Sequence, residues 1–198
     1  MSDSSTNLLI VQSSLHAKST TAAMCRFVDS HAQSLGANVT YIDLREFDLP
    51  IFDPQTGRDT EGYKKLVGPV NDAHAFLLGT PDYHGGPSAG IKNFLDYFWT
   101  EFTGKLFGYV CASHEKGLTV MDALRTAVRQ CYGWSLPYGV AAIEKTEVEP
   151  EGEIIDERVK NRLIMLSHDL VRYGKVLSDT RAEDIAHSDP TFLANLRS

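Results

Sequence analysis

Short, almost wholly apolar segments alternate with longer amphipathic ones along this chain of 198 residues, and this order restricts the fold more than any other feature. The apolar segments include NLLIVQ at residues 7–12 and AHAFLLGT at residues 73–80. Strands that lie between two layers of helices read as continuous apolar runs, because both of their faces are buried. The sequence therefore predicts a parallel sheet with helices on both sides.

The expected elements form one regular series. Strands are predicted at residues 7–12, 38–44, 73–80, 106–112 and 138–143, and helices at 19–35, 63–71, 91–102, 118–132 and 156–177. Five strands and five helices in this order favour a doubly wound, flavodoxin-like five-stranded parallel α/β sheet with strand order 2-1-3-4-5, whose ligand binds beyond the carboxyl ends of strands 1 and 3. We expect a single domain over residues 1–198, with a polar C-terminal tail from about residue 178.

Composition limits the possible binding partners of the protein and the cellular compartment in which we expect it. The formal net charge is −7, whereas a nucleic-acid-binding face needs basic residues, so no nucleic-acid partner is expected. No segment has the roughly 18 apolar residues of a membrane span, and the amino-terminal MSDSSTN does not resemble a secretion signal. Three cysteines without a CxxC pair indicate a reducing compartment, and the histidines lack metal-ligand spacing. We therefore expect a cytoplasmic protein with no metal ion and no membrane contact.

The loop after the first strand, SSLHAKSTT at residues 13–21, carries five hydroxyl groups, one lysine and one histidine, and no acidic residue. It leads into a helix, whose N-terminal N–H groups attract anions. Serine and threonine at this position can also simply cap the helix. Neither GxxxxGK[ST] nor GxGxxG occurs in the chain, so a single phosphate group fits this loop better than a nucleoside triphosphate or a Rossmann-bound dinucleotide.

A second motif, GTPDYHGGPSAGIKNFLDYFW, spans residues 79–99 and joins the third strand to the following helix. Glycine lets the backbone approach a ligand closely, and an aromatic side chain can lie against a ring, so its turn suits a flat ligand such as a flavin. The residues GPSAG also match the GxSxG nucleophile motif of hydrolases. Because Ser88 falls after a turn of about six residues, at a helix start, a helix cap is the favoured interpretation.

Three segments carry a family resemblance. SSLHAKSTT is similar to GSxRxxSxN, with His16 in place of arginine; YIDLREFDLPIFDP is similar to an IDL…LPLFD segment; and TPDYHGGPSAGIKNFLDYF is similar to TPEYNGSxPGxLKNxLDW. In these motifs the chain resembles the NADPH-dependent FMN reductase family of flavodoxin-like proteins. The resemblance extends from residue 7 to about residue 132.

This resemblance implies a site for FMN. The phosphate would lie against Ser14, His16, Ser19, Thr20 and Thr21, and the ring system against Pro81, Asp82, Tyr83, His84 and Gly85. The loop after the fourth strand, with Ser113 and His114, would reach the pyrimidine side of the ring. No catalytic side chain is expected, because the flavin carries the chemistry.

The implied activity is an FMN-dependent NAD(P)H oxidoreductase that reduces a small acceptor, such as a flavin or a quinone, by hydride transfer. Two alternatives stay open: an FMN-binding electron-transfer protein without nicotinamide turnover, and a serine hydrolase that uses Ser88. In the helix after the third strand, the apolar stripe leaves out Tyr97 and Trp99. These aromatics would be exposed, and such a second apolar face suits a homodimer or tetramer.

Overall fold

The computed structural model describes residues 5–16, 18–114, 116–149 and 152–186. The strands are β1 (Asn7–Gln12), β2 (Asn38–Asp43), β3 (Ala75–Tyr83), β4 (Gly86–Pro87), β5 (Leu106–Ala112), β6 (Trp134–Ser135) and β7 (Val140–Ala142). The helices are α1 (Thr20–Ser34), α2 (Glu61–Asp72), α3 (Ala89–Tyr97), α4 (Leu118–Gln130) and α5 (Glu157–Ala186).

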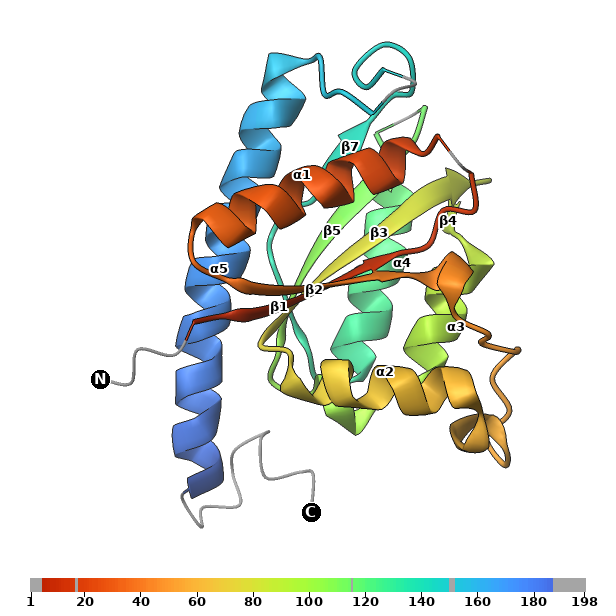
Figure 1. Ribbon diagram of the computed structural model, residues 1–198, viewed down its shortest axis with the longest axis vertical. Helices are drawn as coiled ribbons and strands as arrows, with labels where there is room; N and C mark the ends of the chain where they lie inside the picture. The colour runs from red at the N-terminus through yellow and green to blue at the C-terminus, as the bar shows by residue number, and fades with distance from the viewer. Residues whose placement is uncertain (1–4, 17, 115, 150–151, 187–198) are drawn as a thin grey trace.

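The central sheet has the order β2-β1-β3-β5, followed by β6 and β7 at the far edge (Figure 1). These strands are parallel, and their register places Val11 beside Ile42 on one side and beside Leu78 on the other. The predicted flavodoxin-like order 2-1-3-4-5 is confirmed. The carboxyl ends of β1, β3 and β5 consequently meet at one edge of the sheet, where such folds bind their ligands.

The sheet differs from the prediction at two points. The expected fifth strand is divided into β6 and β7, which pair separately with β5, and Pro137 lies between them. Proline has no N–H to donate to a strand ladder, which accounts for the interruption. In addition, β4 runs antiparallel to the end of β3, with Asp82 opposite Pro87, so the sheet is not wholly parallel.

Two apolar layers cover the sheet. On one face α1 and α5 pack together over alternate strand residues such as Leu8, Ile10 and Leu77, and on the other face α2, α3 and α4 pack over Leu9, Val11 and Leu78 (Figure 1). The alternation follows from the two-residue period of a strand, which sends neighbouring side chains to opposite faces. Among the described residues, no helix is both long and apolar enough to cross a membrane.

Two predicted helices have different ends. The helix expected to reach residue 102 stops at Tyr97, where Phe98 becomes extended, and a short 3-10 turn follows at Thr100–Phe102. The last helix continues to Ala186, so the tail expected from about residue 178 begins as helix. The remainder of that tail, residues 187–198, lies outside the described residues.

Tyr97 was expected to be exposed, and this expectation is wrong. Its side chain is fully buried, its hydroxyl donates to the Pro50 carbonyl oxygen at 2.8 Å, and its ring contacts Phe52 edge to face. The segment after β2 folds back over α3 and covers this ring, a contact that the periodicity of α3 alone does not reveal. Trp99, by contrast, is 58% exposed, as expected.

The cysteines take no part in a disulfide. Cys25 and Cys111 are buried, and Cys131 is partly buried. Burial raises the pKa of the Cys25 thiol, and burial together with the nearby Asp82 carboxylate raises that of Cys111 to about 12. All three therefore stay protonated at neutral pH and behave as small apolar residues.

Candidate cofactor site

A cavity of about 250 Å³ lies at the carboxyl ends of β1, β3 and β5. It is lined by Ser14, His16, Lys18, Ser19, Thr20, Thr21, Pro81, Asp82, Tyr83, Ala112, Ser113, His114 and Glu144. All the cofactor-binding residues expected from the sequence line this cavity, except His84 and Gly85. The structure therefore brings together three loops that lie up to about a hundred residues apart in the chain.

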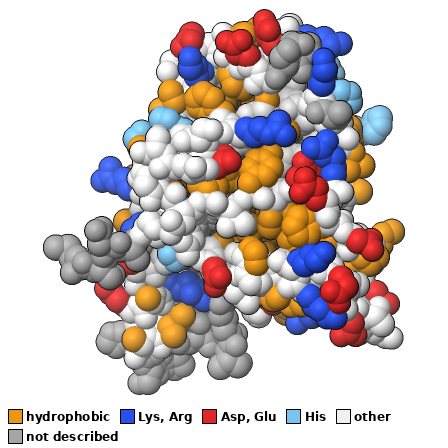
Figure 2. All heavy atoms as spheres, viewed as in Figure 1, with side chains coloured by type: hydrophobic (Ala, Val, Ile, Leu, Met, Phe, Trp, Pro, Cys, Tyr) orange, Lys and Arg blue, Asp and Glu red, His pale blue; other side chains and the backbone are white. Residues whose placement is uncertain are grey.

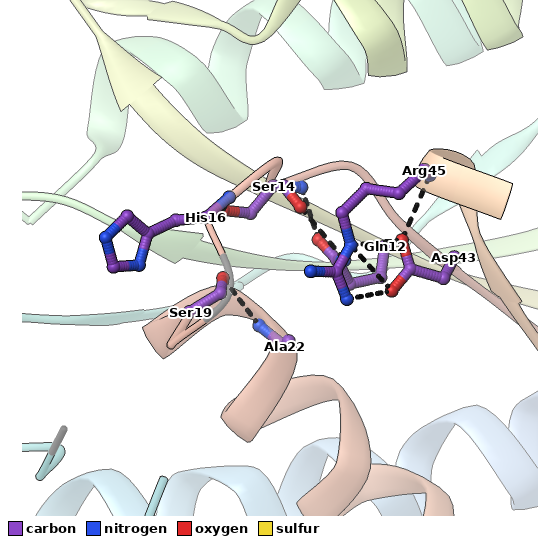
Figure 3. Close-up of polar contacts among 7 residues, drawn as sticks. All are labelled: Gln12, Ser14, His16, Ser19, Ala22, Asp43 and Arg45. Atoms are coloured by element: carbon purple, nitrogen blue, oxygen red, sulfur yellow. Dashed lines mark hydrogen bonds and ion pairs between the residues drawn. The ribbon is translucent and has the colours of Figure 1, made fainter. Parts of the chain in front are cut away.

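The loop after β1 is anchored from below by Gln12. The Gln12 side-chain amide donates to the Ser14 carbonyl oxygen at 3.1 Å and accepts the Ser14 N–H (Figure 3). Beside it, on β2, Asp43 accepts a two-pronged contact from the Arg45 guanidinium, with distances of 3.0 and 2.6 Å to its two oxygens. A planar guanidinium matches a carboxylate in this way, which fixes both side chains. Gln12 therefore holds the loop through hydrogen bonds, and it lies beside the fixed Asp43–Arg45 pair.

The Asp43 carboxyl is 7% exposed, and its burial acts to raise its pKa. Hydrogen bonds from Arg45 and Gln12 outweigh this effect and hold the pKa below its ordinary value. A carboxyl with a lowered folded-state pKa stabilises the fold above its unfolded-state pKa. This stabilisation is then lost as the pH falls through the folded-state pKa.

Replacing Asp43 with asparagine is expected to lower the free energy of unfolding by about 1–3 kcal/mol at pH 7, because the charged hydrogen bonds are lost. The variant should also lose the part of the acid dependence that the wild type shows below about pH 4. Urea unfolding between pH 2.5 and 7 measures both effects, with Asp72→Asn, an exposed carboxylate at the end of α2, as the control. An unchanged acid dependence in Asp43→Asn would contradict this assignment.

Helix α1 points its N-terminus into the cavity. Ser19 is the N-cap residue and accepts the Ala22 N–H at 3.1 Å, so the capping interpretation of this serine is confirmed (Figure 3). The buried Thr21 Oγ1 has no hydrogen-bond partner within the described part of the chain. A buried hydroxyl without a partner costs free energy, and a phosphate oxygen would satisfy it. Together with the helix N-terminus, this donor set fits the phosphate of FMN.

His16 also lies in this loop. Its Nδ1 is 2.8 Å from the Lys18 carbonyl oxygen and donates to it, because a carbonyl oxygen only accepts. This bond orients the imidazole and leaves Nε2 for another partner. His16 and Lys18 both line the cavity and can place N–H donors around an anion, at the point where the family that this chain resembles has arginine.

The turn after β3 is tied to the loop after β5 through Asp82. One of its carboxylate oxygens accepts the Gly85 N–H at 2.8 Å, and the other accepts the Ser113 hydroxyl at 2.7 Å. His84 and Gly85 have φ values of 56° and 80°, in the left-handed region that a tight turn requires. Asp82 thus fixes the relative position of two cavity walls. Tyr83 is 56% exposed and offers its ring to a ligand.

Ser88 acts as a helix cap, as expected. Its Oγ accepts the Ile91 N–H at the start of α3 and lies 2.8 Å from the Ser13 Oγ. Ser13 in turn donates to the Gly79 carbonyl oxygen at 2.9 Å, so the Ser88 proton points to Ser13. This buried series of hydrogen bonds joins the ends of β1 and β3 to α3. The Ser88 hydroxyl is committed to it, and the hydrolase alternative loses its nucleophile.

Among the described residues that line the cavity, only Glu144 comes from outside the three predicted loops. Lys18 and Ala112 belong to loops that the sequence had already singled out. Glu144 follows β7, whose residues end at the same edge of the sheet. The rule that ligands bind beyond the carboxyl ends of parallel strands, applied to the last strand, could have identified it.

Strand order and the position of the cavity define the protein as a flavodoxin-like α/β protein. A family model described as NADPH-dependent FMN reductase matches residues 6–147, well over half of the chain. The chain belongs to this family and is an FMN-dependent NAD(P)H oxidoreductase.

Individual proteins show the same likeness. A Bacillus sp. (strain OY1-2) NADPH azoreductase is 30% identical over 99 residues, which are 48% of this chain and 56% of that protein. An FMN-dependent NADPH-azoreductase of Staphylococcus aureus is 28% identical over 142 residues, which are 67% of this chain and 74% of that protein. The structure of FerB, a flavoenzyme NAD(P)H:(acceptor) oxidoreductase from Paracoccus denitrificans, shares the fold with a TM-score of 0.72 at 17% identity, over 87% of this chain and 98% of that one.

Proposed function

We propose that this chain uses FMN, held in the cavity at the ends of β1, β3 and β5, to reduce quinones, flavins or azo compounds with NAD(P)H. The observation that carries this proposal is the meeting of the α1 N-terminus with the end of β3 in one cavity. The Staphylococcus aureus relative is named an azoreductase, and FerB is named an NAD(P)H:(acceptor) oxidoreductase, which supports a small, diffusible acceptor.

Within this proposal, the residues of the chain bind and orient. Ser14, His16, Ser19, Thr20 and Thr21 hold the phosphate, and the N–H groups of the first turn of α1 add donors and partial positive charge. FMN, when bound, supplies the electron-transfer chemistry.

The ring wall is formed by the end of β3 and the loop after β5. Asp82 holds the turn against Ser113, which keeps this wall rigid. The backbone of Pro81 and Asp82 provides the close approach, and the Tyr83 ring, which also lines the cavity, is exposed. His114 borders the same wall.

The purified protein is expected to show the visible absorbance of oxidised flavin, or to gain it stoichiometrically when titrated with FMN. Anaerobic addition of NADPH should then bleach this absorbance at a rate at least as fast as catalytic turnover. Absence of flavin absorbance, together with no response to FMN in titration, would overturn the proposal. Flavin that is bound but is not bleached by NADPH or NADH would instead favour the electron-transfer alternative.

We also propose that the protein is a cytoplasmic homodimer or tetramer. Three unpaired thiols agree with a reducing compartment. Three large side chains, Trp99, Tyr132 and Trp134, are 46–58% exposed, and the Gly104 N–H donates to the Tyr132 carbonyl oxygen, so their two segments are neighbours. Aromatic residues at this exposure favour an interface between subunits. Light scattering on the purified protein measures the assembly.

A further inference from the structure

A second cavity, of about 310 Å³, lies beyond the edge strand β7, between the N-terminal parts of α4 and α5. It adjoins the cofactor cavity. Ser113 lines both, and the Ser113 N–H donates to the Ala142 carbonyl oxygen at 3.1 Å, which joins the loop after β5 to the end of β7. The two cavities are therefore neighbours, with Ser113 in the wall of both.

The walls of this second cavity are cationic. Lys116, Arg125, Arg158 and Arg162 line it, against a single carboxylate, Glu147, among the described residues. The whole chain carries a formal net charge of −7, and over the face drawn in Figure 2 the acidic and basic side chains are interspersed. Four cations around one small cavity are thus a local exception, and they create a field that attracts anions.

The charged groups in the cavity are only partly used within the chain. Arg162 donates through Nη2 to the Gly139 carbonyl oxygen at 3.0 Å, but its buried Nε has no partner among the described residues. Arg125 pairs with Asp122, whose side chain is 74% exposed, so this pair is weak. Glu147 accepts the Ile143 N–H at 2.7 Å, which directs its carboxylate to the backbone. The cavity thus keeps hydrogen-bond donors and positive charge for a ligand.

The start of α4 adds to this field. Its N-cap is Gly117, which has no side chain to accept the first N–H groups of the helix; the Ser113 Oγ accepts the Gly117 N–H at 3.1 Å. Leu118 and Met121, from the first turn, line the cavity. A helix N-terminus carries partial positive charge and favours phosphate groups.

We propose that this cationic cavity binds the adenosine phosphates of the nicotinamide dinucleotide while its nicotinamide ring lies in the cofactor cavity. The inference rests on the proposed function and locates the donor of that reaction. A dinucleotide fits this path because it joins a flat ring to several phosphates, and the two adjoining cavities offer a flat wall and a cationic wall in that order. The same cations would also attract a sulfonate or carboxylate of an anionic acceptor, and the experiment separates these two sources.

The probe is adenosine 2′,5′-bisphosphate, which carries phosphates but no nicotinamide. Its affinity for the FMN-loaded protein is measured by calorimetry at fixed ionic strength. We expect Arg158→Glu and Arg162→Gln each to weaken this binding about tenfold or more, because each loses a charged hydrogen bond to phosphate. Arg172→Glu is the matched control for Arg158→Glu: it makes the same charge change on α5, about 21 Å further along the helix and outside the cavity.

Steady-state kinetics provide the second measurement. In Arg158→Glu the KM for NADPH should rise about tenfold with kcat unchanged, whereas the KM for reduced nicotinamide mononucleotide, which lacks the adenosine part, should not change. Equal effects in Arg158→Glu and Arg172→Glu, or no effect on either adenosine ligand, would overturn the proposal. A rise only in the KM of an anionic acceptor would also overturn it and assign the cavity to the acceptor.

Flavin content, read from the absorbance of each sample, separates this test from that of the proposed function. A protein that binds no FMN refutes the function itself. A protein that binds FMN and is reduced by NADPH, but whose arginine variants retain full affinity for adenosine 2′,5′-bisphosphate, refutes only the assignment of the second cavity. Because Arg158 is exposed, its replacement tests the cavity even if Arg162→Gln fails to fold.

Discussion

Replacing Gly79 with alanine is expected to lower the free energy of unfolding by about 2–3 kcal/mol. Gly79 lies in β3 directly beneath α1, where a methyl group would overlap the Cys25 Sγ and come within 3.1 Å of Thr21 Cγ2. Both neighbours are buried side chains of α1, so the helix would have to move away from the sheet. Urea unfolding of the apoprotein at pH 7 measures the change.

Cys25 provides the control for this prediction. Cys25→Ala alone removes a buried sulfur and is expected to cost about 1 kcal/mol. In the double variant the new methyl group at residue 79 occupies part of the space that Sγ leaves. The combined loss should therefore be about 1–2 kcal/mol smaller than the sum of the two single losses. Simple additivity would mean that this contact does not limit how closely α1 approaches β3.

Replacing Thr21 with valine is expected to weaken FMN binding about tenfold or more, because a hydrogen bond to a charged phosphate contributes about 1.5–3 kcal/mol. The same change should leave the apoprotein as stable as the wild type or more stable. Valine has nearly the shape of threonine, and the buried Oγ1 that it removes has no partner within the described residues. A general structural defect would lower both FMN affinity and apoprotein stability, so a loss of affinity without a loss of stability would point to the phosphate contact.

Riboflavin distinguishes the phosphate from the ring in this experiment. It lacks the phosphate, so Thr21→Val should bind it as the wild type does, whereas FMN affinity falls. Flavin fluorescence quenching measures both ligands, and Thr40→Val, an exposed change on β2, serves as the control. An equal loss of riboflavin and FMN affinity would show that Thr21 shapes the cavity without binding the phosphate.

The sequence predicted the fold well where burial alone decides the backbone. The apolar runs of β1 and β5 have the bounds expected from their residues, because a strand buried on both faces can place no polar side chain in its interior. The prediction failed at α3. Phe98 and Phe102 continue the apolar stripe of a helix, yet they reach the core from an extended residue and a 3-10 turn. Periodicity records which side chains are buried, and it does not record the backbone that carries them there.

The residues of the candidate site could be predicted from the sequence for a related reason. In a doubly wound sheet the loops that follow β1, β3 and β5 must meet, so the polar residues of those loops could be chosen before any distance was known. Side-chain interactions that hold these loops in place from other elements could not be predicted in this way. The pairing of Asp43 with Arg45 beneath the Ser14 loop depends on side-chain directions that no motif specifies.

For this protein, then, the sequence by itself determined the alternation of strands and helices, the family resemblance and the loops that form the cofactor cavity. These features depend on local periodicity and on the direction of parallel strands. Only the tertiary structure decided that the Tyr97 ring is covered, that Thr21 keeps a buried hydroxyl without a partner among the described residues, and that four cations gather beside β7. Each of these depends on side chains from elements distant in sequence, whose meeting is set by packing.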